Sequence, residues 1–600
     1  MLCPPLFAAG RAFTGAGIPP LRQGSDPRRE EETAPGGETG GQREEKGGTQ
    51  VNFDFSYLDV AFKNGSVVTV NERDEIAQAV GVKGNRIVFV GTNEDIDRLI
   101  DSHTRVIDLA GRSLLPGFND AHFHPILNGM LGPDMECGMI DTTQKNCKSL
   151  AEMLQMIRDT AKTIPAGKWI SMMGYEPLLF PEGRHPTIEE LDDCAPDNPV
   201  HCMHGGGHIC MYNHKALEYL GVYTAEDAKK YPPDEVEVID GKLTGMVRGH
   251  THFWLWGQVD YSPAQQRKAA LKSQQKCFEN GITSVGDMGE CDAPSYHTMQ
   301  KLCRDGEFRV RTYMALHSIF GKPFSLEDNE HFLKLGFMTG LGDEHFRVGP
   351  CKFMIDGGTG GPSCATREPY SHDPELPRER GWEREESWDY IKRINDAECQ
   401  CTAHAVGDLA IEFMVEGYER CFAENPERVR ALRHRIEHCV IVDPDLIARM
   451  AKMNICPILH TGLVQMLGKN FSEFYGPERN KYLEAVRSML DAGIHVALHS
   501  DAPSGPVGVQ VIDGAVNRYD RSKNFQCDRT QAVSVLEAIR CYTLNSAYAA
   551  HEDHIKGSIE VGKLADLIIL SDDILAIDPM DIHSLKVDLT MIDGVVEYER

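Results

Sequence analysis

Short apolar runs alternate with amphipathic segments through the interior of the chain. Three helical patterns are each followed by a strand-like apolar run, and these pairs are 264–280 with 282–285, 445–452 with 455–460, and 480–492 with 494–498. Strands that alternate with helices favour a parallel sheet covered by helices. The pattern therefore predicts an α/β fold, which we interpret as a TIM-like (β/α)8 barrel.

Strand patterns joined by tight turns occupy both ends of this region. Apolar and polar residues alternate over 58–70, and the runs 79–82 and 87–90 flank the turn Lys83-Gly84-Asn85. The C-terminal region repeats the pattern, with the apolar run 567–570. Short strands separated by turn residues are typical of antiparallel sheets. We predict one small β-sandwich assembled from both chain ends.

These patterns divide the chain into parts. The expected boundaries are 57–115 with 557–600 for the sandwich, 116–556 for the barrel, and about 127–256 for an insertion in the barrel. The insertion is hard to read as repeated β/α units, and it could cover the active face. Residues 1–56 are rich in Gly, Pro, Glu and Arg, so they cannot bury enough apolar surface to fold. They are predicted to form a disordered extension.

Composition narrows the classes of function. The formal net charge is −28, and such an acidic surface repels phosphate backbones, which disfavours a nucleic-acid partner. No run of about 18 apolar residues is present, so we expect no membrane span. The 18 cysteines follow no disulfide framework, and the first residues lack the features of a secretory signal. We expect a cytoplasmic protein with free thiols and a small-molecule substrate.

Two histidines stand two residues apart after the apolar segment Leu114–Phe118. On a strand, residues two apart point the same way, so the imidazoles of His122 and His124 would face one site. Two such groups are a good start for a divalent-metal site. One pair among 24 histidines could also arise by chance.

Further polar residues close or interrupt short apolar runs at four later positions, which are Lys352, His404, His438 and Asp501. A buried lysine is costly unless it is paired or chemically altered. In a barrel, the ends of successive strands meet at one catalytic face, so these four side chains would converge with His122 and His124. A second cluster, Cys202, His204, His208 and Cys210, matches none of the usual structural zinc spacings and is the less favoured metal site.

As a set, these motifs resemble the amidohydrolase superfamily, and within it the YtcJ-like (amidohydrolase 3) branch. The resemblance extends over nearly everything after residue 57, including Pro199–Leu217, Gly241–Arg248 and Gly557–Asp566. It implies the same barrel-plus-sandwich architecture, and often a homodimer. It also implies a set of metal ligands, which are His122, His124, His404, His438 and Asp501, and it gives Asp501 the additional role of proton transfer.

Lys352 stands where related enzymes often carry a carboxylated lysine that bridges two metals. We therefore expect one or two divalent ions, with zinc as the first choice and iron, manganese or nickel as alternatives. An unmodified structural lysine beside a single metal is the other interpretation.

Several positions depart from the branch. Relatives tend to show an Arg and an Asp before a Gly-His pair, but here only Gly207-His208 is retained. Gly249 stands where relatives tend to have Glu, and Gly358 stands in place of a usual Ser. The metal ligands are intact, so these differences do not affect the expected metal chemistry. They do mean that the substrate cannot be taken over from relatives.

The expected reaction is hydrolysis of a non-peptide C–N bond, of amide or formamide type, by metal-activated water. Asp501 would act as general base and then general acid, and His208 would polarise the carbonyl, unless His208 is only a surface residue of a Gly-rich loop. Two other classes stay open. One is a metal-dependent isomerase, lyase or decarboxylase on the same barrel, and the other is a binding protein that has lost its chemistry.

Other side chains have two interpretations each. Three carboxylates could orient the ligands or form only salt bridges, and these are Asp356, Asp408 and Glu437. For Asp356 the expected partner is Lys352. The aromatic run 253–256 could line a pocket, although core packing is the preferred interpretation.

Overall fold

The computed structural model describes most of the chain after residue 57. The described ranges are 58–132, 139–143, 146–233, 235–259, 261–289, 293–317, 327–378 and 384–600. The predicted extension, 1–56, lies outside them.

Eight parallel strands form the central sheet. Their order is β8 (Phe118–Phe123), β15 (Ile282–Asp287), β16 (Arg311–Leu316), β17 (Phe346–Met354), β18 (Cys401–Ala405), β19 (Arg435–His438), β20 (Cys456–Leu459) and β21 (Ala497–Leu498). Backbone hydrogen bonds also link the two outer strands just beyond their ends. Asp501 donates to His122 O at 3.0 Å, and His124 donates to Ala502 O at 3.1 Å. The sheet is thus a nearly closed barrel, which confirms the predicted TIM-like architecture.

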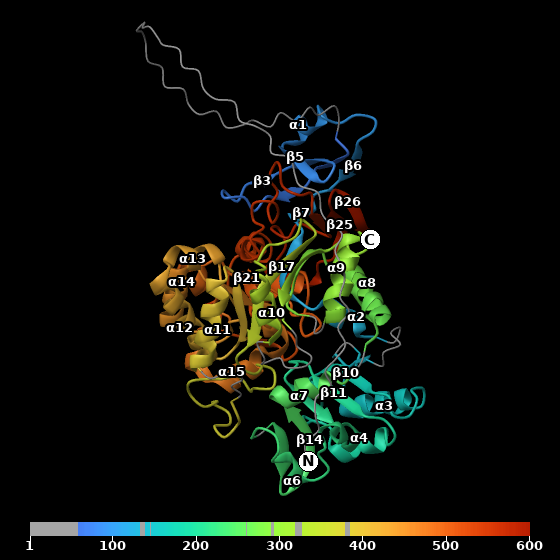
Figure 1. Ribbon diagram of the computed structural model, residues 1–600. Helices are drawn as coiled ribbons and strands as arrows, with labels where there is room; N and C mark the ends of the chain where they lie inside the picture. The colour runs from blue at the N-terminus through green and yellow to red at the C-terminus, as the bar shows by residue number, and fades with distance from the viewer. Residues whose placement is uncertain are drawn as a thin grey trace, which may run out of the picture. The chain divides into compact units, whose positions relative to one another are not determined.

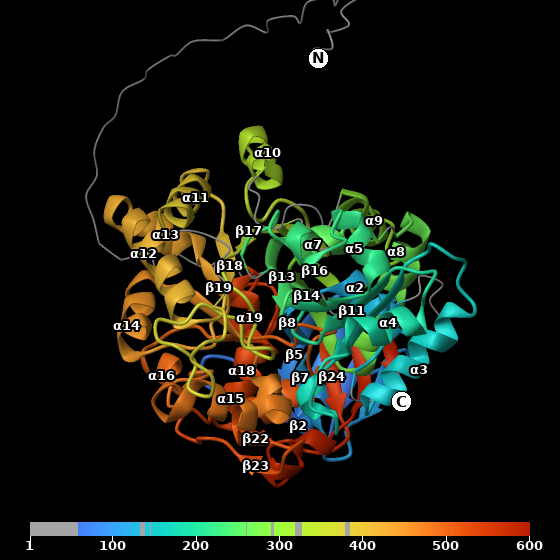
Figure 2. The same ribbon diagram turned by 90° about the horizontal axis from the view of Figure 1, so that it is seen from below.

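Local sequence signals fix where the covering helices begin and end. Ser262 caps α8 (Pro263–Glu279) through a capping box, and a proline occupies the first turn. Asp443 caps α14 (Pro444–Met453), which ends at Asn454 in the left-handed region. Figure 2 shows helices around the outside of the strands, among them α8, α9 (Ala293–Arg304), α12 (Asp408–Glu424) and α14.

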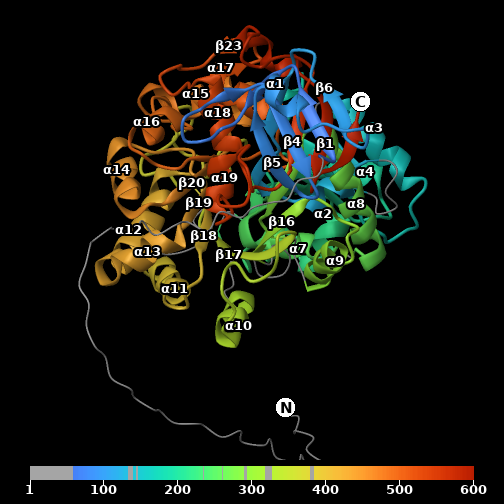
Figure 3. The same cartoon turned by 90° about the horizontal axis from the view of Figure 1, so that it is seen from above.

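Two further sheets contain residues from the chain ends. One has the order β26 (Val595–Glu599), β25 (Val587–Ile592), β24 (Leu567–Leu570), β7 (Ser113–Pro116), β2 (Ser66–Val68) and β3 (Ile76–Ala77). The other has the order β5 (Arg86–Gly91), β4 (Ala79–Lys83), β1 (Val60–Lys63) and β6 (Arg105–Asp108), whose strands lie side by side in Figure 3. Phe62 and Val80 from one sheet share a buried cluster with Leu114 and Leu567 from the other.

A separate sheet lies between β8 and β15 in the sequence. Its order is β13 (Val236–Ile239), β14 (Lys242–Arg248), β12 (Ile209–Tyr212), β11 (Val200–His204), β10 (Ile170–Tyr175) and β9 (Met139–Asp141). Figure 1 shows this inserted sheet, in teal and green, at the end of the barrel opposite the blue and red sheets. Helix α7 (Gly249–Trp256) follows it directly.

Two absences predicted from the sequence concern membranes and disulfides. Within the described ranges, no helix combines the length and apolar character needed to cross a membrane. The 15 cysteines of these ranges are all buried free thiols.

Candidate metal centre

One pocket collects all seven residues that the sequence favoured as metal ligands or catalytic groups. These lining residues are His122, His124, His208, Lys352, His404, His438 and Asp501. Six of them stand on β8, β17, β18 and β19 or just beyond β8 and β21, at the C-terminal ends of the barrel strands. His208 comes from the turn between β11 and β12 of the inserted sheet. Polar and apolar side chains both line the pocket, as in many small-molecule sites.

Asp501 lies at the centre of the group. Its Oδ1 is 3.4 Å from Nε2 of His122 and 3.4 Å from Nε2 of His124. Lys352 Nζ approaches the same Nε2 of His122, at 3.3 Å. Nitrogen and oxygen atoms from three strands of the barrel therefore point at one small volume.

In each of three histidine rings, one nitrogen is hydrogen-bonded to an oxygen that can only accept a hydrogen bond, so that nitrogen carries the hydrogen. His122 Nδ1 donates to Glu437 Oε2 at 2.8 Å, and His124 Nδ1 donates to Gly289 O at 3.3 Å. His404 Nε2 donates to Gly357 O at 3.1 Å. In the neutral rings of His122 and His404, the remaining nitrogen is therefore free of hydrogen and offers a lone pair, as a metal ligand requires.

Burial sets the charge states of the centre. It lowers the pKa of His122, His404 and His438 well below the ordinary value, so these rings are neutral at neutral pH. Burial also lowers the pKa of Lys352 to about 8, although Glu437 and Asp501 oppose it. Burial alone would raise the pKa of Asp501, but the hydrogen bond and charge of His124 hold it below its usual value.

Glu437 satisfies both interpretations offered by the sequence. It accepts from His122, and its Oε1 also accepts from Arg435 Nε at 2.8 Å and from Thr402 Oγ1 at 2.7 Å. The side chains of Glu437 and Arg435 are completely buried. A carboxylate held on both sides fixes the ring of His122 in one orientation.

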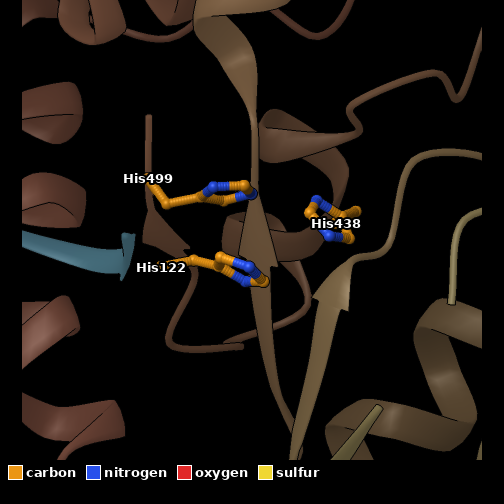
Figure 4. A group of neighbouring side chains, drawn as sticks. All are labelled: His122, His438 and His499. Atoms are coloured by element: carbon orange, nitrogen blue, oxygen red, sulfur yellow. The ribbon is translucent and has the colours of Figure 1, made fainter. Parts of the chain in front are cut away.

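Sequence reasoning missed two histidines at the same end of the barrel. His460 follows β20 and lines the pocket, and His499 follows β21. Figure 4 shows the rings of His122 and His499 side by side and facing His438, with centroids of both 5 Å or less from that of His438. Both missed residues close apolar runs that had been recognised as strands, so the signal used for His404 would have found them.

Two neighbouring carboxylates have partners other than those considered from the sequence. Asp356 does not hold Lys352, because its carboxylate accepts from the backbone N–H groups of Ala365, Val406 and Gly407. Asp408 accepts from the backbone of Arg367 rather than from a histidine. Each carboxylate lies where chain segments meet, and satisfying several backbone donors there braces the loops.

The aromatic run meets both interpretations, since Phe253 and Trp256 belong to the main hydrophobic cluster and also line the pocket. Phe253 and Trp256 are buried and line the pocket, whereas Trp254 is 40% exposed. Phe253 and Trp256 are three residues apart in α7, close to one helical turn, so they share a face of the helix that Trp254 does not. His208 is not a surface residue, since it is buried and its ring lies 4.5 Å from that of His404.

The cysteine–histidine cluster does not assemble as one site. Cys202 and Cys210 belong to different hydrophobic clusters. Among the described residues, Cys210 instead groups with His201 and His252.

The donor set at the centre fits a divalent ion. Ligand atoms within 4.8 Å of one another occur in three overlapping groups, which are His122 with His124 and Asp501, His438 with His460 and Asp501, and His122 with His438 and His499. Neutral imidazoles together with a carboxylate suit zinc and similar metals. The shared members His122, His438 and Asp501 tie the groups into one centre.

Comparisons with known proteins agree with this arrangement. The model of a family described as the amidohydrolase family matches residues 105–598. The chain is 28% identical over 551 residues to N-substituted formamide deformylase of Arthrobacter pascens, which covers 90% of this chain and 98% of the relative. It is 26% identical over 555 residues to the putative amidohydrolase YtcJ of Bacillus subtilis (strain 168), with 89% and 98% covered. A solved structure of an uncharacterised metal-dependent hydrolase from Pyrococcus horikoshii OT3 has a TM-score of 0.67 at 21% identity, and covers 87% of this chain and 99% of that one.

The barrel, its donor set and these matches define a metal-dependent hydrolase that acts on carbon–nitrogen bonds other than peptide bonds. The chain belongs to the amidohydrolase family, in its YtcJ-like branch.

Proposed function

We propose that the protein hydrolyses the C–N bond of a small amide or formamide. The observation that carries the proposal is the convergence of Asp501 Oδ1 on Nε2 of His122 and Nε2 of His124 inside the pocket. The relative from Arthrobacter pascens, named N-substituted formamide deformylase, supports the formamide type of substrate.

The proposed metal ligands are His122, His124, His404, His438 and Asp501, with zinc as the first choice of metal. When bound, a divalent ion would supply a nucleophile near neutral pH by lowering the pKa of its water. Lys352 is proposed to be carboxylated and to hold a second ion. Its lowered pKa supports this, because the neutral amine is the form that adds CO2, releasing one proton as the carbamate forms.

The chain's own residues divide the remaining work. Asp501 takes the proton of the attacking water and delivers it to the leaving nitrogen. Burial lowers the pKa of His208 to about 3, so its ring is neutral and can donate one hydrogen bond to the substrate carbonyl. The inserted sheet, which carries His208, contributes part of the pocket wall beside the reacting atoms.

We also propose that the two sheets from the chain ends pack together as a single β-sandwich. The buried cluster that they share supports it.

A panel of N-substituted formamides and small amides in ¹⁸O-labelled water tests the reaction. We expect one ¹⁸O atom in the released acid. Asp501→Asn should lower kcat by about 10²–10⁴-fold, the usual contribution of general acid–base catalysis, while the four histidine ligands keep the metal bound. The matched control is Asp193→Asn, the same change at an exposed helix position, which should keep full activity.

Two results would contradict this account. Near-normal turnover by Asp501→Asn would remove its proton-transfer role. Product without ¹⁸O would favour the alternative of a metal-dependent isomerase, lyase or decarboxylase.

A further inference from the structure

A buried acid stands in the pocket wall contributed by the inserted sheet. Glu176 directly follows β10, lines the pocket and is 6% exposed. Its Oε2 lies 3.1 Å from Nε2 of His204, the last residue of β11, but it has no partner in hydrogen-bonding geometry. The role proposed for the metal centre does not use this carboxylate.

The partner histidine does not neutralise Glu176. The backbone N–H of Gly206 donates to His204 Nδ1 at 3.0 Å, and a backbone N–H can only donate. Nδ1 is therefore bare, and His204 is the neutral tautomer with its hydrogen on Nε2. Among the described residues, no lysine or arginine forms an ion pair with Glu176. An ionised carboxylate buried without a cation is costly, so this wall is suited to a cation brought by a ligand.

Glycines leave the carboxylate open. A Cβ on Gly205 would lie 2.4 Å from Glu176 Oε1, and one on Gly360 would lie 3.5 Å from the same atom. Gly360 follows three residues after Gly357, whose carbonyl accepts from His404. Glu176 and His404 line the same pocket, so one ligand in it can contact both the acid and the metal centre.

Apolar side chains lie along the pocket beside this acid. They are Met173, Met203, Phe253 and Trp256. Aromatic rings and thioethers pack against an alkyl chain, and an aromatic face also attracts a cation. The formal net charge of −28 favours the approach of cations to the molecule.

We propose that Glu176, beside His204, is a subsite for a cationic nitrogen. The substrate class is then an amide or formamide that also carries an ammonium group. The subsite is argued from the geometry of the pocket alone, whereas the substrate class rests on the proposed function.

Binding without turnover tests the subsite. Isothermal titration calorimetry at pH 7 on the metal-loaded full chain compares n-hexylammonium with its neutral counterpart 1-hexanol. We expect the wild type to bind the ammonium at least about tenfold more tightly, the effect of one hydrogen bond to a charged group. Glu176→Gln should bring the ratio of the two affinities to about one. The control Glu189→Gln, at an exposed position of the same inserted region, should keep the wild-type ratio.

A second variant covers the event that Glu176→Gln fails to fold. Gly205→Ala should also lower the ratio, because its Cβ would displace the carboxylate. Equal binding of both probes by the wild type would overturn the subsite, as would an unchanged ratio in a folded Glu176→Gln. A ratio lost in Asp501→Asn but kept in Glu176→Gln would place the cation at the metal centre and overturn it too.

The outcomes separate the two proposals. If no amide or formamide is hydrolysed while the binding ratio depends on Glu176, the proposed function fails and the subsite stands. If the panel is hydrolysed while the wild-type ratio is one, only the subsite fails.

Discussion

Single side chains at the centre are held by partners that leave one atom free. The ring of His122 is fixed by Glu437, and Glu437 is fixed in turn by Arg435 and Thr402. Such outer partners set the tautomer and raise the basicity of a ligating imidazole. The chain from Arg435 to His122 therefore prepares a lone pair before any ion arrives.

Removing the charge of Glu437 tests this preparation. We expect Glu437→Gln to weaken metal binding by about 10–100-fold, the usual cost of losing such a partner, because the amide can no longer fix the ring as firmly. Competition against a chelator of known affinity measures the change. Glu189→Gln, an exposed control, should leave the affinity as it is in the wild type. An unchanged affinity in Glu437→Gln would show that His122 is positioned by other contacts.

At the scale of elements, Arg311 joins the barrel to the C-terminal sheet. It begins β16, is 1% exposed, and its guanidinium binds Asp566 at 2.6 Å and Asp593 at 2.5 Å. Burial would raise the pKa of Asp593, but the hydrogen bonds and charges of His345 and Arg311 hold it below 3.8. The ion-paired state of Asp593 thus favours the folded protein.

We expect Arg311→Met to destabilise the protein by about 3–5 kcal/mol, because it leaves buried carboxylates without their cation. The contribution of Asp593 is complete above its unfolded-state pKa and is lost as the pH falls through its lower folded-state pKa. The difference in melting temperature between wild type and variant should therefore narrow below about pH 4. Thermal unfolding monitored by circular dichroism from pH 3 to 8 measures both effects. A difference that does not change with pH would argue against the ion pair as the cause.

Elements with a strong local pattern were predictable from the sequence. The helix expected at 445–452 is α14, and its limits follow from the cap Asp443 and from Asn454. The helix expected at 480–492 is wrong in its first half, since α16 covers only Val486–Asp491. Residues just before it belong to a turn that pairs Leu483 with Ile441, a distant contact that no local pattern reveals.

The candidate site was predictable where a polar residue closes an apolar run on a barrel strand, as at His404 and Asp501. Glu176 could not be found this way. Its significance depends on the neutral tautomer of His204 and on the missing side chain of Gly205, which are properties of the folded inserted sheet. The partners of Asp356 were missed for the same reason, because they are backbone groups of distant loops.

At the scale of the whole described molecule, chemistry and stability lie at opposite ends of the barrel. The C-terminal ends of the strands meet the inserted sheet around the pocket, and the other end meets the sheets built from the chain termini (Figure 1). This division is general for barrel enzymes, where loops after the strands carry the reaction. The insertion lines the pocket but supplies none of the proposed metal ligands, so substitutions in it can alter substrate specificity and leave the metal centre intact.

The metal content of freshly purified protein, prepared without chelators, tests the central claim most directly. We predict one or two equivalents of a transition metal in the wild type and in the exposed control His103→Ala, and loss of the metal in His122→Ala. A stoichiometry near two would favour carboxylated Lys352 between two ions. Absence of metal from the wild type, even after incubation with zinc, manganese or iron, would contradict the account of a metal-dependent hydrolase.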